Sequence, residues 1–252
     1  MYTLKKSLGQ HFLKDEEVCR KIISYLQEME FTRLLEVGPG GGALTKYLIS
    51  IPGKDFLAVE LDQEKVDYLV KTYPALQGKI IHESILEMAK PFSGKFTVVG
   101  NFPYNISSQI LFKILEWKEE VECMVGMFQK EVAQRVVSKE GTKVYGVLSV
   151  LVQAFFETRY LFEVGEDSFQ PPPKVKSAVI RLTPRKEPLA MQSEKLFFML
   201  VKAAFNQRRK TLRNAVKDLF TKEELADDIF NKRAEQLKVE DFGYLTFRMR
   251  AF

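Results

Sequence analysis

The sequence has 252 residues, enough for one large domain and a small one, and its 46% hydrophobic and 28% charged residues are those of an ordinary globular protein. The two cysteines are far apart and there are two histidines, which argues against a disulfide framework and a metal site. The sequence has no apolar run of transmembrane length and no signal-peptide pattern, so we expect a cytoplasmic protein without a membrane partner. The net charge of +5 permits a polyanionic partner without requiring one.

Strand-like and helix-like segments alternate as far as Leu182, which predicts an α/β fold with a doubly wound sheet. The last two expected strands are joined by a Pro-rich loop with no helical pattern. A parallel crossover usually contains a helix, so we expect this final pair to be antiparallel. The seven expected strands are Leu34–Val37, Phe56–Glu60, Lys79–His82, Phe96–Gly100, Met124–Phe128, Arg159–Val164 and Ala178–Leu182.

A glycine-rich turn, Gly38-Pro39-Gly40-Gly41-Gly42, directly follows the first expected strand and precedes apolar residues at helical spacing. Glycines let the backbone turn sharply and approach a ligand closely. Because residue 43 is alanine, the turn lacks the full G-x-G-x-x-G dinucleotide fingerprint, and it fits an adenosyl group without a pyrophosphate at least as well. The next strand ends in Glu60, whose carboxylate can accept hydrogen bonds from both ribose hydroxyls.

The tetrapeptide Asn101-Phe102-Pro103-Tyr104 ends the strand expected at 96–100. The exocyclic amine of adenine is a poor nucleophile because its lone pair is delocalised into the ring, and acceptors on its N–H groups draw that density back. The Asn101 side-chain oxygen and a backbone carbonyl near Pro103 are such acceptors, and the Tyr104 ring can stack on a base pulled out of its helix. A strand-ending turn is the alternative reading of the tetrapeptide alone.

Four chemistry-bearing residues, Gly38, Glu60, Ser84 and Asn101, fall at the carboxyl ends of expected strands. Ligands of open α/β sheets bind at that edge, so we expect the four to converge on one pocket. Asp62 has a different expected role, as the cap of a helix that starts near Gln63.

The pattern changes after the last strand. Residues 183–188 resemble a linker, and residues 193–252 are helical in pattern. We therefore expect two domains, 1–184 and a small helical one at 185–252. The segment 208–213 of the second domain carries four positive charges, and on a helix Arg209 and Arg213 would share a face. A solvated helix face is the ordinary meaning of such a run, but crowding of like charges without nearby acids favours an RNA-facing patch formed by Arg208, Arg209, Lys210 and Arg213.

In number, order and spacing these motifs resemble those of the KsgA family of ribosomal RNA adenine dimethyltransferases. The resemblance runs essentially from end to end. It is carried by Lys5–Leu13, Glu36–Gly42, Glu60, Asn101–Tyr104, Gln129–Ala133, Phe169–Ser177, Ala204–Arg213 and Arg233–Leu237.

The resemblance implies a Rossmann-like methyltransferase fold of seven strands with the last one antiparallel. It also implies S-adenosyl-L-methionine as cofactor, and as products N6,N6-dimethyladenosines at two adjacent positions near the 3′ end of 16S rRNA. The implied partner is the small ribosomal subunit during its biogenesis, and we expect a monomer without a metal ion. The alternatives are a large-subunit rRNA dimethyltransferase of the macrolide-resistance type, a DNA adenine methyltransferase, and an RNA-binding assembly factor for which methylation is secondary.

The resemblance also assigns site residues. The N-terminal Gln10, His11 and Leu13 are expected to fold over the cofactor, and Gly38 and Gly40 to pack against its methionine and ribose parts. Phe169 is expected on the face of the target base opposite Tyr104, and the alternative is a core phenylalanine. The sequence departs from the family at Ser84, where an Asp usually holds the cofactor's adenine amine. Either Ser84, the Glu83 side chain or the Ile85 backbone takes over that contact, and we expect weaker cofactor binding.

Overall fold

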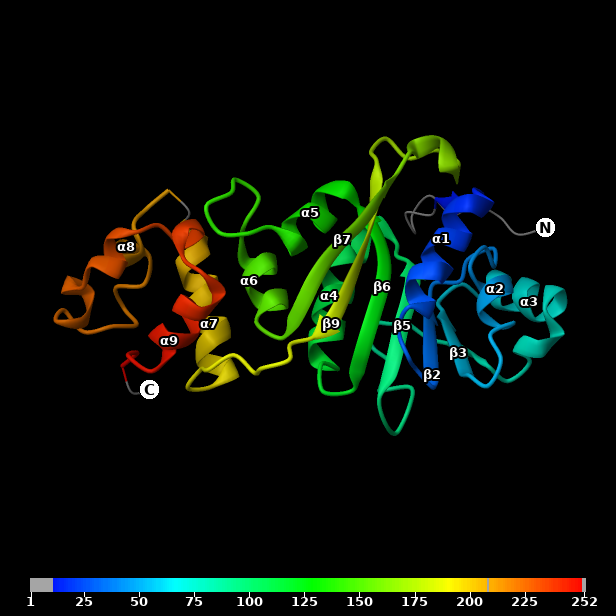
Figure 1. Ribbon diagram of the computed structural model, residues 1–252, viewed down its shortest axis with the longest axis horizontal. Coiled ribbons are helices and arrows are strands. Elements are labelled where there is room, and N and C mark those ends of the chain that lie inside the picture. The colour runs from blue at the N-terminus through cyan, green and yellow to red at the C-terminus, as the bar shows by residue number, and fades with distance from the viewer. Residues whose placement is uncertain (1–10, 208, 251–252) are drawn as a thin grey trace. The chain divides into compact units, whose positions relative to one another are not determined.

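The computed structural model describes residues 11–207 and 209–250, which form two compact units (Figure 1). The first contains the described residues up to Ala133 together with Arg159–Pro184, and the second contains Gln134–Thr158 and the described residues from Arg185 onward. The predicted boundary at residues 184/185 coincides with a border between the units. Residues 134–158, which the prediction placed in the first domain, group instead with the second unit, because the helix that they contain packs there.

The first unit is built on a seven-stranded sheet, in which all seven expected strands are present. The strand order is β4-β3-β2-β5-β6-β9-β7. The bounds are β2 (Arg33–Val37), β3 (Asp55–Glu60), β4 (Ile80–His82), β5 (Phe96–Asn101), β6 (Val121–Gln129), β7 (Phe156–Val164) and β9 (Ser177–Pro184).

The sheet is parallel from β4 to β6, and the last strand of the chain, β9, runs antiparallel to β6, with Met124 opposite Leu182 and Gln129 opposite Ser177. The α/β methyltransferase-like topology predicted from the sequence is thus confirmed. The central strands β2 and β5 are buried along nearly their whole length, as expected for parallel strands covered on both faces.

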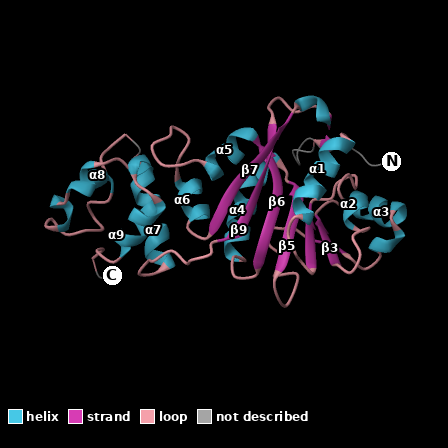
Figure 2. Cartoon of the chain, in the orientation of Figure 1, coloured by secondary structure: helices cyan, strands magenta, loops and turns pink. Residues whose placement is uncertain are grey.

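Helices of the first unit connect these strands and cover the sheet, as the cyan and magenta elements of Figure 2 show. They are α1 (Glu16–Gln27), α2 (Thr45–Leu48), α3 (Gln63–Thr72), α4 (Ser107–Glu116) and the start of α5 (Lys130–Val137), with short 3-10 turns at Pro74–Leu76, Tyr104–Ile106 and Glu166–Ser168. α1 buries an apolar stripe at helical spacing, formed by Cys19, Ile22, Ile23 and Leu26.

A second, two-stranded sheet was not predicted. β1 (Phe12–Leu13) pairs antiparallel with β8 (Phe169–Gln170), so that Leu13 lies opposite Phe169. Asp15 follows β1 and caps α1 by accepting hydrogen bonds from the N–H groups of Glu17 and Val18, and it also accepts one from the Ser168 hydroxyl. These contacts tie the N-terminal segment to a loop more than 150 residues away in sequence.

The second unit is helical, as predicted. It contains α6 (Val147–Gln153), α7 (Glu194–Asn206), α8 (Leu212–Ala215) and α9 (Val239–Thr246), and 3-10 turns at Glu224–Ala226, Asp228–Asn231 and Ala234–Gln236. α7 contacts α6, α8 and α9, and therefore forms the centre of this unit. No described helix is long and apolar enough to cross a membrane.

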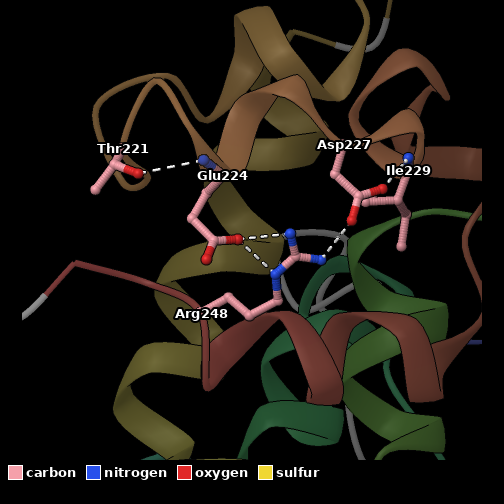
Figure 3. Close-up of polar contacts among 5 residues, drawn as sticks. All are labelled: Thr221, Glu224, Asp227, Ile229 and Arg248. Carbon is pink, nitrogen blue, oxygen red and sulfur yellow. Dashed lines mark hydrogen bonds and ion pairs between the residues drawn. The ribbon is translucent and has the colours of Figure 1, made fainter.

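Arg248, just after α9, holds the last part of the chain to the 221–231 segment (Figure 3). Its Nε and Nη2 both lie 2.5 Å from Glu224 Oε2, and its Nη1 lies 2.9 Å from Asp227 Oδ2. Asp227 in turn accepts a hydrogen bond from the N–H of Ile229, and the Glu224 N–H donates to the Thr221 hydroxyl oxygen. Charge-assisted bonds from one planar guanidinium to two acids give this contact a defined geometry.

Candidate functional site

The expected convergence at the carboxyl edge of the sheet is present. Gly38 follows β2, Glu60 ends β3 and Asn101 ends β5, and these three parallel strands are neighbours. They open into a cavity of about 430 Å³, a size that suits a nucleoside-sized ligand. Of the predicted site residues, the cavity is lined by His11, Leu13, Gly38, Gly40, Glu60, Ser84, Ile85, Asn101, Pro103 and Tyr104. Gln10 and Arg208 lie outside the described residues.

The glycine turn needs its glycines. Gly38 and Gly40 have φ angles of +67° and +57°, in the left-handed region that side chains disfavour. A Cβ on Gly40 would also lie 3.1 Å from the ring of Phe12 in β1. The N-terminal segment therefore packs directly on the glycine turn, at the place where the resemblance expected it to cover a cofactor.

Glu60 is fixed by two backbone donors. Its Oε2 accepts a hydrogen bond from Gly40 N–H at 3.2 Å, and its Oε1 accepts one from Asp62 N–H at 3.0 Å. The carboxylate is 7% exposed, and each oxygen keeps a further lone pair for a ligand hydroxyl. Asp62 caps α3 by accepting from Glu64 N–H, as predicted, so the two acids have separate tasks.

The tetrapeptide at the end of β5 is anchored by its phenylalanine. Phe102 is 1% exposed and packs on Phe128, with ring centroids 4.8 Å apart. A Cβ at Gly100 or Gly126 would lie within 2.7 Å of the Phe102 ring, so both glycines are needed to make room for it. The buried ring fixes the backbone from which Asn101 and Tyr104 project.

Asn101 and the N-terminal segment are joined by a hydrogen bond. The Asn101 Nδ2 donates to the carbonyl oxygen of His11 at 3.1 Å, which leaves the Asn101 Oδ1 as an acceptor. The His11 ring lies 5.4 Å from the Tyr104 ring, tilted by 31°, and its Nδ1 is 2.9 Å from the carbonyl oxygen of Pro171. No local pattern in the sequence indicates that His11 lies next to Tyr104.

Tyr104 is held by a hydrogen bond between its hydroxyl and that of Ser177, the first residue of β9. Burial raises the pKa of the Tyr104 phenol above its ordinary value, with the Ser177 bond opposing, so the ring stays neutral at physiological pH. The Ser107 hydroxyl donates to the carbonyl oxygens of Pro103 and Tyr104, at 3.2 and 3.1 Å. Local sequence patterns did not indicate that Ser107 and Ser177 make these contacts with the tetrapeptide.

Phe169 lies elsewhere than the expected stacking position. It is 1% exposed, belongs to the hydrophobic core together with Leu13 and does not line the cavity. In this conformation it cannot stack on a base. The core alternative describes its place, because pairing of β8 with β1 turns the residue opposite Leu13 into the core.

Ser84 lines the cavity between Glu83 and Ile85. Its hydroxyl oxygen accepts a hydrogen bond from Leu86 N–H at 3.3 Å, and its carbonyl accepts from the N–H groups of Glu87 and Met88. The hydroxyl is therefore already an acceptor within its own turn, and its hydrogen remains to be donated. Unlike an Asp, it adds no charge to the cavity.

The basic segment is not a continuous helix. α7 ends at Asn206 and α8 begins at Leu212, so Arg209 and Lys210 lie in a turn and do not share a helix face with Arg213. The expectation of one helical face was wrong because Gln207 leaves helical geometry and Thr211 is extended. All three basic side chains are exposed.

Positive charge is concentrated in the second unit. Its residues include 18 Lys and Arg against 12 Asp and Glu, a net charge of +6, whereas the first unit has 20 against 21, a net charge of −1. Among the described residues, no group of three or more His, Cys, Asp and Glu side chains is placed to hold a metal ion.

Sequence comparison gives consistent matches. The family model "Ribosomal RNA adenine dimethylase" matches residues 1–246. Proteins named ribosomal RNA small subunit methyltransferase A from Flavobacterium johnsoniae and Parabacteroides distasonis are 51% and 50% identical. The alignments cover 98% and 96% of this chain, and 96% and 92% of those relatives.

Solved structures show the same architecture. A dimethyladenosine transferase from Plasmodium falciparum matches with a TM-score of 0.78 at 26% identity, over 92% of this chain and 94% of that one. The 23S rRNA methyltransferase ErmE matches with a TM-score of 0.69 at 23% identity, over 92% and 99%, which shows a shared fold. With a family model that spans nearly the whole sequence and relatives that are about half identical to it, the chain belongs to the ribosomal RNA adenine dimethylase family.

Proposed function

We propose that this protein transfers methyl groups from S-adenosyl-L-methionine to the N6 amines of two adjacent adenosines near the 3′ end of 16S rRNA in the small ribosomal subunit. The observation that carries the proposal is one cavity with two kinds of wall. The glycine turn and Glu60 form a side suited to a nucleoside, and Asn101, Pro103 and Tyr104 form a side suited to an adenine amine.

The nucleoside-binding side fits the cofactor on structural grounds. Glu60 is held by two backbone donors with lone pairs left for ribose hydroxyls, and the positive-φ glycines let the backbone approach the ligand. Ser84 and Ile85, on the cavity wall, are proposed to contact the adenine ring, and His11 and Leu13, which also line the cavity, to cover the cofactor. When bound, S-adenosyl-L-methionine supplies an electrophilic sulfonium methyl.

On the other side, the protein's task is positioning. The Asn101 Oδ1 accepts one N–H of the target amine, since its Nδ2 is already committed to the His11 carbonyl. The Pro103 carbonyl is the second acceptor, and the Tyr104 ring, fixed by Ser177, stacks on the extruded base. Alignment of the amine nitrogen with the methyl group carries most of the catalysis. No strong general base is required, because the nitrogen becomes acidic once it is alkylated.

The second unit is proposed to contact the rRNA. Its net charge of +6 and the exposed Arg209, Lys210 and Arg213 suit a phosphate backbone. Arg208 is proposed to belong to that contact. Lys174 and Lys176, which lie near the start of β9 in the first unit, are proposed as separate phosphate contacts of that unit. A ribosomal substrate also agrees with the cytoplasmic location and the monomeric, metal-free state expected from the sequence.

Two other functions are less well supported. A large-subunit rRNA dimethyltransferase could have this fold, which the 23S rRNA methyltransferase ErmE shares, but the relatives that are about 50% identical over nearly the whole chain are named for the small subunit. An assembly factor with secondary methylation would need the RNA-binding surface but not the Asn101 amide.

Asn101→Ala separates these roles. The variant and the wild type are compared for binding to small subunits that lack the dimethyladenosines and for methylation of them. We expect binding to remain within about twofold and methylation to fall at least about a hundredfold, since an acceptor that aligns the amine is lost. Unchanged methylation by Asn101→Ala would overturn the proposed mechanism.

A further inference from the structure

A buried carboxyl on the cavity wall has no part in the proposed mechanism. Glu36 lies in β2, the central part of the parallel sheet, between Ala58 of β3 and Val99 of β5. It is 1% exposed, and its side chain lines the cavity beside the glycine turn. A carboxyl group buried in this way costs free energy as the anion unless hydrogen bonds or cations compensate.

Hydrogen bonding offsets little of the free-energy cost of an ionised Glu36. The hydroxyl of Thr45, the first residue of α2, donates to Glu36 Oε2 at 2.7 Å, and Thr45 is itself completely buried. Among the residues that the structure describes, none forms an ion pair with Glu36. The other ionisable side chains on the cavity wall are His11, Glu16, Lys46, Glu60, Lys65, Tyr73, Glu83 and Tyr104.

The nearby charges favour a neutral carboxyl. Lys46 forms an ion pair with Glu16, and the Lys65 Nζ lies 3.9 Å from Asp62 Oδ2. Burial raises the pKa of Glu36 from 4.5 to about 8, the Thr45 hydrogen bond opposes this, and the charge of Glu60 adds to it. Near neutral pH the free protein therefore holds a proton on Glu36.

The two forms of the proposed cofactor differ by one charge in this cavity. S-adenosyl-L-methionine carries a sulfonium cation, whereas its demethylated product has a neutral thioether sulfur. A cation that enters a low-dielectric cavity next to a carboxyl favours the carboxylate, and a neutral sulfur does not.

We propose that Glu36 gives up its proton when the cationic methyl donor binds and takes it back when the neutral product remains, so that this side chain discriminates S-adenosyl-L-methionine from S-adenosyl-L-homocysteine. The inference rests on the proposed cofactor. The exchange is balanced, since a carboxylic acid and a cationic ligand give a carboxylate, the bound cation and one free proton. After methyl transfer the sulfonium cation has become a neutral sulfur, so the attraction between the ligand and the Glu36 carboxylate is lost and product release is favoured.

The consequence is a pH-dependent preference with a definite sign. Below the pKa of free Glu36, S-adenosyl-L-methionine must displace a proton, so its affinity falls by up to about tenfold for each unit of decreasing pH. The product needs no such displacement. The affinity ratio of methyl donor to product therefore rises with increasing pH below the pKa of free Glu36 and levels off at about pH 8.

Titration calorimetry of the wild-type protein with each ligand tests the proposal. The measurements cover about pH 6 to 9, in two buffers with different ionisation enthalpies, so that the number of protons released on binding is obtained directly. The matched control is Glu36→Gln, which keeps the shape and the hydrogen bond from Thr45 but cannot titrate. The α-amino groups of the ligands titrate equally with either protein, and comparison of the two proteins cancels their contribution.

We expect the wild type at about pH 7 to release close to one proton more with S-adenosyl-L-methionine than Glu36→Gln does, and the pH slope of the affinity ratio to flatten in the variant. Thr45→Val removes the hydrogen bond from the Thr45 hydroxyl, which favours the anion, so the pH at which the affinity ratio levels off should rise. Equal proton release by wild type and Glu36→Gln, with both ligands bound, would overturn the inference alone. Failure of the folded wild type to bind either ligand would overturn the proposed cofactor and the inference with it.

Discussion

Glu60→Gln is the substitution that most sharply tests the nucleoside-binding side of the cavity. In the wild type both carboxylate oxygens accept backbone hydrogen bonds, from Gly40 N–H at 3.2 Å and Asp62 N–H at 3.0 Å. A glutamine has one oxygen and one NH₂ group, so one of the two backbone donors must face another donor. Because Glu60 is 7% exposed, water can compensate for little of this loss.

The expected cost has two parts. Loss of one charge-assisted hydrogen bond destabilises the free protein by about 1.5–3 kcal/mol, which lowers the melting temperature by several degrees. Loss of one ribose acceptor costs a similar amount of binding free energy, which weakens the affinity for S-adenosyl-L-homocysteine by about 10- to 100-fold. Thermal unfolding without ligand measures the first part, and calorimetry at a temperature where both proteins are folded measures the second.

Glu119→Gln makes the same chemical change at a side chain that is 78% exposed, and it should alter neither quantity measurably. If Glu60→Gln binds the ligand as tightly as the wild type while Glu119→Gln also does, Glu60 does not bind the ribose, and the assignment of this side of the cavity is wrong.

Three further substitutions test other parts of the structure. Tyr104→Ala should reduce methylation about 10- to 100-fold by loss of stacking, whereas Tyr104→Phe and Ser177→Ala, which remove only the hydroxyl contact, should reduce it less; single-turnover assays measure this order, and equal losses in all three would contradict it. Ser84→Asp should bind S-adenosyl-L-homocysteine more tightly than the wild type does, as measured by calorimetry. An unchanged affinity would show that residue 84 does not determine how tightly the cofactor binds. Arg248→Met should lower the stability of the second unit to denaturant by about 1 kcal/mol, while Arg250→Met, at an exposed position, should not; equal effects would refute the role given to the contact in Figure 3.

Local patterns predicted the sheet well because each strand carries its own signal. Buried parallel strands such as β2 and β5 consist mostly of apolar residues, and a glycine or a polar residue marks the strand end. The Gly38 turn and Glu60 could therefore be placed at one edge of the sheet before any contact was known. That edge is where ligands of such sheets bind, which is why the cavity wall was also largely predictable.

What escaped prediction depends on contacts between distant residues. β1 and β8 have two residues each, too few for a periodic pattern, and their pairing buries Phe169, for which the family resemblance implied a stacking role. The bond from Tyr104 to Ser177 spans 73 residues, and nothing local to either marks it. In the 208–213 segment, charge density was visible but the break between α7 and α8 was not, because no glycine or proline marks it.

The most direct test of the central claim is methylation of the proposed substrate. The protein is incubated with labelled S-adenosyl-L-methionine and small ribosomal subunits that lack the 3′-end dimethyladenosines, and the modified nucleotides are mapped by mass spectrometry. The proposed function predicts N6,N6-dimethyladenosine at two adjacent positions near the 3′ end of 16S rRNA, and at least about a hundredfold slower methylation with Asn101→Ala. Labelling of large-subunit rRNA instead, or no labelling by protein that binds both cofactor and subunit, would contradict it.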